Sequence, residues 1–173
     1  MSTIDTRSHT AIHIVKGAVV KVLGAKWSAS AYASGVHGGI AVQIDRKPTE
    51  EEIRLIEEKA NNEVKDNHSI EIFEISKTDA EARWGDEIYD LFPLPAELTM
   101  LKIFHIPNWN INTCGKQHTR TTGEVGTIKI VKWRYRAQKH LLEFLHAATP
   151  LKNIGESGAT SHILQPLSRA TDR

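Results

Sequence analysis

The sequence HTAIHIVKGAVVKVL, residues 9–23, combines an apolar pattern of helical period with two histidines four residues apart. Its apolar side chains recur at intervals that place them on one helix face: Ala11, Val15, Ala18, Val19 and Val22. Several of these residues are β-branched, which favours strands, but the period predicts a helix with one buried face. On such a helix His9 and His13 point in the same direction, so both imidazoles can reach one metal ion.

Capping signals and hydrophobic periodicity predict further elements along the chain. Thr49 and Glu52 form a capping box ahead of apolar residues at helical spacing, which are Ile53, Ile56, Ala60 and Val64. A shorter helix is predicted over 78–85 (TDAEARWG), ending at its glycine. Strands are predicted over 40–45 (IAVQID), 69–76 (SIEIFEIS), 98–106 (LTMLKIFHI) and 127–138 (TIKIVKWRYRAQ). Residues 139–147 (KHLLEFLHA) fit a strand or a helix, and 33–39 (ASGVHGG) and 107–118 (PNWNINTCGKQH) are predicted to be turn and loop.

These elements predict an α+β fold in which an antiparallel or mixed β-sheet packs against helices. A chain of 173 residues with 40% hydrophobic and 25% charged content can bury one sizeable core, so we expect one domain over residues 1–150. Beyond Pro150 the composition shifts to small and polar residues, and 151–173 are predicted to be a weakly ordered tail.

The composition also indicates the cellular compartment in which the protein acts. No apolar run approaches the ~20 residues that span a membrane, and the first residues lack the apolar stretch that drives secretion, so we expect a cytoplasmic protein without a membrane partner. The single cysteine, Cys114, cannot form an internal disulfide, which leaves its sulfur free for other chemistry.

A second motif, CGKQH over residues 114–118, offers two more metal ligands at the same spacing. Together the two motifs supply three imidazoles and a thiolate, a common zinc set: His9, His13, Cys114 and His118. No glutamate follows His9, which excludes the zinc-protease pattern. In the competing interpretation Cys114 is a small buried hydrophobe and the histidines are hydrogen-bonded surface groups.

The two motifs carry a family resemblance. HTAIH, then CGKQH followed by TRTTGEVGTIKIVK (119–132), resembles the HxxxH and CxxxH motifs in the editing modules of alanyl-tRNA synthetases and their free-standing relatives, the AlaX proteins. The similarity to the short form of AlaX continues through VVKVLGAKW (19–27), DRKPTEEEI (45–53) and IYDLFPLP (88–95). It covers about residues 4–146 and implies the fold of the synthetase editing domains.

The resemblance implies a zinc-dependent aminoacyl-tRNA deacylase that hydrolyses the ester joining serine or glycine to tRNA for alanine. If three side chains bind Zn²⁺, an open position can activate water near neutral pH; if all four bind, the ion is structural or one ligand must yield. The sequence offers both arrangements. Two other functions stay open: editing of seryl-tRNA for threonine, whose synthetase shares the motif layout, and a non-catalytic zinc-stabilised RNA-binding module.

A pocket that separates serine from alanine needs polar groups that pair with the serine hydroxyl. The candidates for substrate binding are Thr10 beside the ligands, Asp90, whose carboxylate could meet the substrate ammonium, and Asn112 just before Cys114. Turn-forming side chains that bond their own backbone are the alternative for Asp90 and Asn112, and an ordinary helix-surface residue is the alternative for Thr10.

Residues 125–142 contain five lysines and arginines but no acid, although the net charge of the chain is only +1. In the predicted strand Lys132, Arg134 and Arg136 alternate with Val131, Trp133 and Tyr135, which places the basic residues on one face. We expect these three basic residues to contact tRNA phosphates. The alternative is that they are solvated charges that protect a strand edge. The sequence does not determine the oligomeric state.

Overall fold

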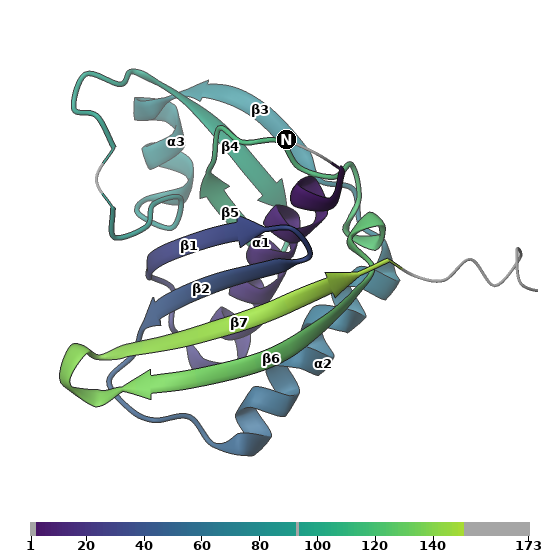
Figure 1. The fold of residues 1–173 in the computed structure, drawn as a ribbon. Helices are drawn as coiled ribbons and strands as arrows, with labels where there is room; N and C mark the ends of the chain where they lie inside the picture. The colour runs from purple at the N-terminus through teal and green to yellow at the C-terminus, as the bar shows by residue number, and fades with distance from the viewer. Residues whose placement is uncertain (1–2, 93, 151–173) are drawn as a thin grey trace, which may run out of the picture.

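The computed structural model describes residues 3–92 and 94–150 and confirms the predicted α+β class. Within these residues every strand pair is antiparallel, in a four-stranded sheet of order β1-β2-β7-β6 and a three-stranded sheet of order β3-β4-β5. The elements are α1 (Thr3–Leu23), β1 (Ser28–Ser34), β2 (His37–Gln43), α2 (Glu50–Asp66), β3 (Glu71–Ser76), α3 (Lys77–Trp84), β4 (Met100–Ile106), β5 (Asn110–Thr113), β6 (Thr127–Arg136) and β7 (Leu141–Thr149). In Figure 1 the three-stranded sheet and α3 lie above the four-stranded sheet, which has α2 behind it.

The first helix lies at the centre of the core and contacts both sheets. Five of its apolar side chains are fully buried: Ala11, Ile14, Val15, Ala18 and Val19. It packs on α2, β1 and β2, and it also contacts β5 of the other sheet. Figure 1 shows α1 behind β1 and β2. The helix predicted over 9–23 is confirmed and begins earlier, at Thr3.

The second helix begins at the predicted capping box. The N–H of Glu52 donates to Thr49 Oγ1 at 3.1 Å, and the N–H of Thr49 donates to the Glu52 carboxylate at 2.9 Å. The predicted apolar face is buried in the core. Asn61 then fastens α2 to β6, because its amide both donates to the carbonyl oxygen of Ile128 and accepts from the Ile128 N–H, each at 2.8 Å.

The short helix and strands β3 and β4 of the second sheet also agree with the predictions. Helix α3 ends at Gly85, whose positive φ of 58° suits glycine. Strand β4 is the middle strand of its sheet, as expected of a stretch that is apolar on both faces. The ambiguous stretch 139–147 contains β7, a strand that pairs with both β2 and β6.

Strand residues also lie where only turn and loop were predicted. Within 33–39 the turn is confined to residues 35–36, because 33–34 end β1 and 37–39 begin β2, and residues 110–113 form β5. Rings from the neighbouring strands lie over the glycines of β2, where a larger residue would leave no room for them. A Cβ on Gly38 would be 2.6 Å from His146 Nε2, and a Cβ on Gly39 would be 2.2 Å from Tyr32 Cε1. Consecutive strand residues face opposite sides, so His146 and Tyr32 lie on opposite faces of the sheet.

The prediction that Val131 shares a face with Trp133 and Tyr135 is wrong. The pairing register of β6 with β7 shifts between Ile130 and Lys132. Such a bulge reverses the alternation of side chains beyond it. Trp133 and Tyr135 therefore pack against the core, whereas Val131 is 52% exposed.

The predicted tail, residues 151–173, lies outside the described residues, and the boundary at residue 150 stays a prediction. Among the described helices, none combines the length and the apolar character that a membrane span requires.

We expect Gly17→Ala to lower the free energy of unfolding by roughly 2 kcal/mol, although alanine is favoured in helices by about 1 kcal/mol. The reason is Trp109, whose Nε1 donates to the Ile14 carbonyl at 3.0 Å and would lie 2.3 Å from a Cβ at Gly17. Urea unfolding measures the effect. In a Trp109→Ala background the same substitution should be neutral or stabilising, and an equal loss in both backgrounds would exclude this contact as the cause.

Acid should destabilise the fold through His146, which is fully buried. Burial, with a smaller contribution from His37, lowers its pKa from 6.5 to about 4. The unfolded chain therefore binds the proton first, and stability falls as pH drops from the unfolded pKa towards the folded one. Between about pH 7.5 and about pH 4.5 the wild type should lose roughly 2 kcal/mol more than a His146→Gln variant. Denaturant unfolding at both pH values checks this, and parallel losses would contradict it.

Candidate metal centre and adjoining cavity

Four metal-ligating side chains from distant parts of the sequence meet beside α1. The donor atoms of His9, His13, Cys114 and His118 all lie within 4.8 Å of one another. His9 Nε2 is 3.3 Å from Cys114 Sγ, and His13 Nε2 is 3.3 Å from His118 Nε2. The structure thus brings the two sequence motifs together in one cluster.

The helical geometry of α1 and the strand geometry of β5 determine where these side chains point. On α1 the two histidines are one turn apart and face the same way. In β5 and the residue after it, alternate side chains point to one face, which carries Asn110, Asn112 and Cys114. This face is turned towards α1, where Cys114 meets His9 and Asn110 meets His13.

The segment after the second motif is held by a hydroxyl group of α1. Thr10 is fully buried, and its Oγ1 donates to the Thr6 carbonyl at 2.9 Å. The same oxygen accepts a hydrogen bond from the N–H of Thr119 at 3.0 Å. Because Thr119 follows His118 directly, this bond helps to fix the position of that ligand.

The cluster fits a tetrahedral zinc ion. With Zn–N near 2.0–2.1 Å and Zn–S near 2.3 Å, neighbouring donor atoms lie roughly 3.3–3.6 Å apart. The two closest pairs, at 3.3 Å each, agree with such edges. Asn110 Oδ1 lies 3.2 Å from His13 Nδ1 and, by accepting its proton, leaves the lone pair on Nε2 to face the cluster.

The histidines are neutral at physiological pH, as metal ligands must be. Burial, with a smaller effect of Lys116, lowers the pKa of His9 to about 4. Burial, with smaller effects of His9 and Lys102, lowers the pKa of His118 to about 3. Burial also lowers the pKa of His13 well below its ordinary value. Protons therefore do not compete for these nitrogens near pH 7.

The thiol needs a cation to ionise. Burial raises the pKa of Cys114, although the backbone and charge of Lys116 act in the opposite direction. A thiolate in this position is favoured when a divalent ion binds and displaces the proton. Neutral imidazoles with an ionisable thiol form a donor set that suits zinc.

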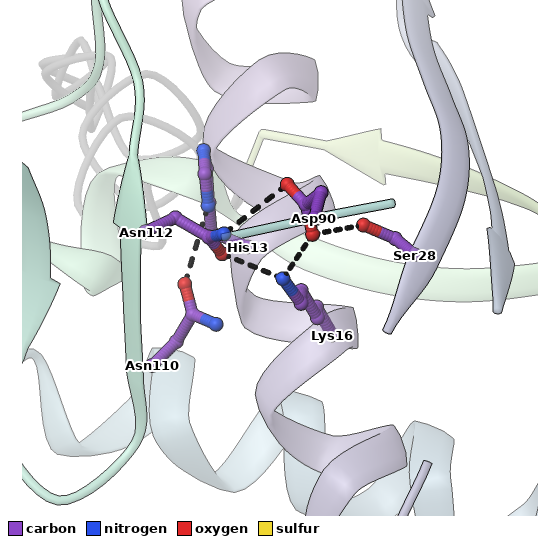
Figure 2. Close-up of polar contacts among 6 residues, drawn as sticks. All are labelled: His13, Lys16, Ser28, Asp90, Asn110 and Asn112. Carbon is purple, nitrogen blue, oxygen red and sulfur yellow. Dashed lines mark hydrogen bonds and ion pairs between the residues drawn. The ribbon is translucent and has the colours of Figure 1, made fainter. Parts of the chain in front are cut away.

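A buried polar network adjoins the cluster (Figure 2). Lys16, on the same helix as the histidines, is 4% exposed and forms an ion pair with Asp90 at 2.5 Å. The Lys16 ammonium also donates to Asn112 Oδ1 at 2.9 Å. Ser28 Oγ donates to Asp90 Oδ1, and Asn112 Nδ2 donates to Asp90 Oδ2 at 3.2 Å. One carboxylate therefore joins α1, β1 and β5.

Between the cluster and the network lies a cavity of about 160 Å³. Three of the ligating residues and all four residues of the network line it. Because a cavity of about 10–15 Å³ on this scale already holds one water molecule, the volume accommodates a group of several non-hydrogen atoms. The cavity therefore has room for a small ligand next to the four-residue cluster.

The structure brings two of the three predicted substrate-binding residues to this cavity. Asp90 and Asn112 line it, whereas Thr10 is not among the lining residues and uses its hydroxyl to hold the chain after His118. Three further residues were missed by the sequence analysis: Lys16, Ser28 and Asn110. A lysine seven residues after His9 on a buried helix face, and the alternation Asn-x-Asn-x-Cys, were signals for two of them.

The predicted RNA-binding residues lie elsewhere, on the outer face of the four-stranded sheet. Lys132 and Arg134 are exposed and line a groove of about 300 Å³ there. Arg136 is half-buried and donates to Glu143 at 2.9 Å, so part of its charge is neutralised. The basic residues do not contribute to the metal cluster.

Fold and site together define an α+β domain with a candidate four-ligand metal centre beside a small cavity that polar side chains line in part. Over most of its length the chain is homologous to a segment of alanine-tRNA ligases. The ligase of Saccharolobus islandicus is 32% identical over 145 residues, 83% of this chain and 16% of the ligase. That of Metallosphaera sedula is 35% identical over 126 residues, 72% of this chain and 14% of the ligase. That of Methanopyrus kandleri is 35% identical over 127 residues, 73% of this chain and 14% of the ligase.

The chain thus spans about one-sixth of the length of the curated relatives that it matches. No family model matches the sequence.

We expect Asn110→Ala to weaken zinc binding about 10- to 100-fold, because the hydrogen bond that orients the His13 ring is lost. Competition with a chromophoric chelator measures the affinity. Asn62→Ala, at an exposed position on α2, is the matched control and should leave the affinity unchanged. Equal zinc affinity in the wild type and Asn110→Ala would mean that Asn110 does not orient the ligand.

Proposed function

We propose that the protein is a zinc-dependent aminoacyl-tRNA deacylase that removes serine or glycine from tRNA for alanine. The observation that carries this proposal is the cluster of three histidines and a cysteine beside a small cavity that a buried polar network lines in part. Homology to alanine-tRNA ligases supports tRNA as the class of substrate. The resemblance of residues 4–146 to the short AlaX proteins supports a free-standing form that acts on tRNA charged by a separate ligase.

The ligands would be His9, His13, Cys114 and His118, in a set of three or of all four. When bound, zinc is a Lewis acid that activates water or a carbonyl group for ester hydrolysis. The protein contributes neutral nitrogen donors, a fixed orientation of His13, and a wall of hydrophobic residues that limits access of bulk water.

The cavity suits a small, polar amino acid. Its volume of about 160 Å³ excludes large side chains, and its polar lining can pair with a hydroxyl group. Ser28 and Asn112 are the side chains that offer such hydrogen bonds. Alanine lacks the hydroxyl and would leave polar groups unpaired, which favours serine over alanine; this discrimination applies to serine alone, because glycine lacks the hydroxyl as well.

Asp90 is the candidate for binding the substrate's ammonium group. Its Oδ1 already accepts from Lys16 and Ser28, whereas Oδ2 accepts from Asn112. A carboxylate oxygen can accept two hydrogen bonds, so Oδ2 has room for one more. Lys16 forms an ion pair with this carboxylate, and the substrate ammonium would share its charge.

Exposed basic residues on the outer sheet face are candidates for contacts with the tRNA backbone. Lys132 and Arg134 lie side by side along β6 without an acidic residue between them. Phosphate contacts of this kind strengthen binding without reading the nucleotide sequence. Arg136 is the weaker candidate, because it is paired with Glu143.

The proposal is tested by incubating the zinc-loaded protein with seryl-, glycyl- and alanyl-tRNA for alanine, and with seryl-tRNA for threonine. We expect release of serine and glycine from the alanine tRNA, little release of alanine, loss of activity on chelation and recovery with zinc. His13→Ala should be inactive, whereas His37→Ala, which removes an exposed histidine of β2, should be active. A preference for the threonine tRNA would change the substrate, and binding of RNA and zinc without hydrolysis would identify a non-catalytic module.

We expect Asp90→Asn to lower kcat/KM for seryl-tRNA by at least about tenfold, because a hydrogen bond to a charged group contributes about 1.5–3 kcal/mol. Asparagine keeps the shape of the side chain and removes its charge. The control is Asp86→Asn, at a largely exposed carboxylate 3.8 Å from Lys26. Thermal unfolding of both variants separates a loss of fold from a loss of substrate binding. Unchanged kcat/KM in a folded Asp90→Asn protein would exclude the ammonium contact.

A further inference from the structure

Two aromatic side chains border the cavity and remain largely exposed. Tyr32 on β1 is 54% exposed, and Phe92, two residues after Asp90, is 44% exposed. Covering apolar surface recovers about 25 cal/mol per Å², so exposed aromatic residues at the edge of a cavity favour binding of a further group. An aromatic face selects a flat partner that can stack on it.

Each of these residues is positioned by a separate contact of the fold, and both line the same cavity. The Tyr32 ring lies against Gly39, where a Cβ would come within 2.2 Å of its Cε1. The N–H of Leu91, next to Phe92, donates to the carbonyl oxygen of Ser28 at 3.0 Å, which ties this segment to β1. Little conformational freedom remains to be lost when a ligand binds to prearranged groups.

Positive charge lies on both sides of this aromatic pair. Lys116 is exposed and borders the same cavity. Tyr32 also borders the outer groove that carries Lys132 and Arg134. Strand β1, which carries Tyr32, is an edge strand of the four-stranded sheet (Figure 1). Aromatic faces beside a basic groove are the combination that binds single-stranded nucleic acid.

We infer that Tyr32 and Phe92 form the site for the base of the 3′-terminal nucleotide of the tRNA, with Lys116 contacting its phosphate. This inference rests on the proposed function, because the ester to be hydrolysed is attached to the ribose of that nucleotide. With the amino acid inside the cavity, the ribose lies at its mouth and the base lies just outside. The preceding nucleotides then pass the edge of β1 towards Lys132 and Arg134.

The first test compares three serine esters: seryl-tRNA, serine esterified to adenosine, and serine methyl ester. We expect Tyr32→Leu and Phe92→Leu each to lower kcat/KM for the first two about tenfold, because stacking of one base contributes ~1–3 kcal/mol. Hydrolysis of the methyl ester, which has no base, should not change. Tyr32→Phe keeps the aromatic face and should resemble the wild type, as should Ile72→Ala, which removes an exposed apolar side chain of β3.

The second test measures binding without catalysis. Calorimetry with adenosine monophosphate and with ribose 5-phosphate should show weaker binding of the first, but not of the second, to both leucine variants. If seryl-tRNA is hydrolysed and the leucine variants match the wild type in both tests, the base site is wrong and the deacylase stands. If no aminoacyl-tRNA is hydrolysed, the deacylase is wrong, and binding of adenosine monophosphate alone decides whether the base site exists.

Discussion

The packing of one face of α1 against β5 is the constraint on which the rest of the structure depends. That face carries two histidines and a lysine at successive turns, and β5 presents two asparagines and leads into the cysteine. Their side chains pair across the contact, so a displacement of either element would separate donors that lie 3.3 Å apart. The indole of Trp109 on Gly17 supports the same contact, because it requires a helix surface without a side chain.

This contact buries charged and polar side chains beside the hydrophobic core. A buried ion pair contributes little to stability by itself, because the desolvation of both partners offsets their attraction. Here both carboxylate oxygens of Asp90 accept hydrogen bonds, and Lys16 donates to Asp90 and to Asn112 at once. Such a network holds its members in fixed positions, which is the property that a binding pocket for a small amino acid requires.

The two faces of the four-stranded sheet have different roles. The inner face buries His146, Leu142 and Phe144 against the helices, and the outer face carries the basic groove. The two glycines of β2 allow this division, because Gly38 accommodates the His146 ring on the inner face and Gly39 accommodates the Tyr32 ring on the outer face. In the proposed function the cavity holds the amino acid and the outer face holds the nucleic acid, and the edge strand β1 lies between them.

The sequence by itself determined the elements whose signals are local. The capping box at Thr49 predicted the start of α2, the apolar period predicted α1, and the spacing of the two motifs predicted the four metal ligands. Only the tertiary structure decided what depends on distant partners. The extent of β1 and β2, the reversal of side chains at Val131, and the use of the Thr10 hydroxyl to hold Thr119 all depend on strand pairing and packing that the local sequence does not specify. The network around Asp90 belongs to the same group, because its members come from four separate segments and none of them identifies its partners locally.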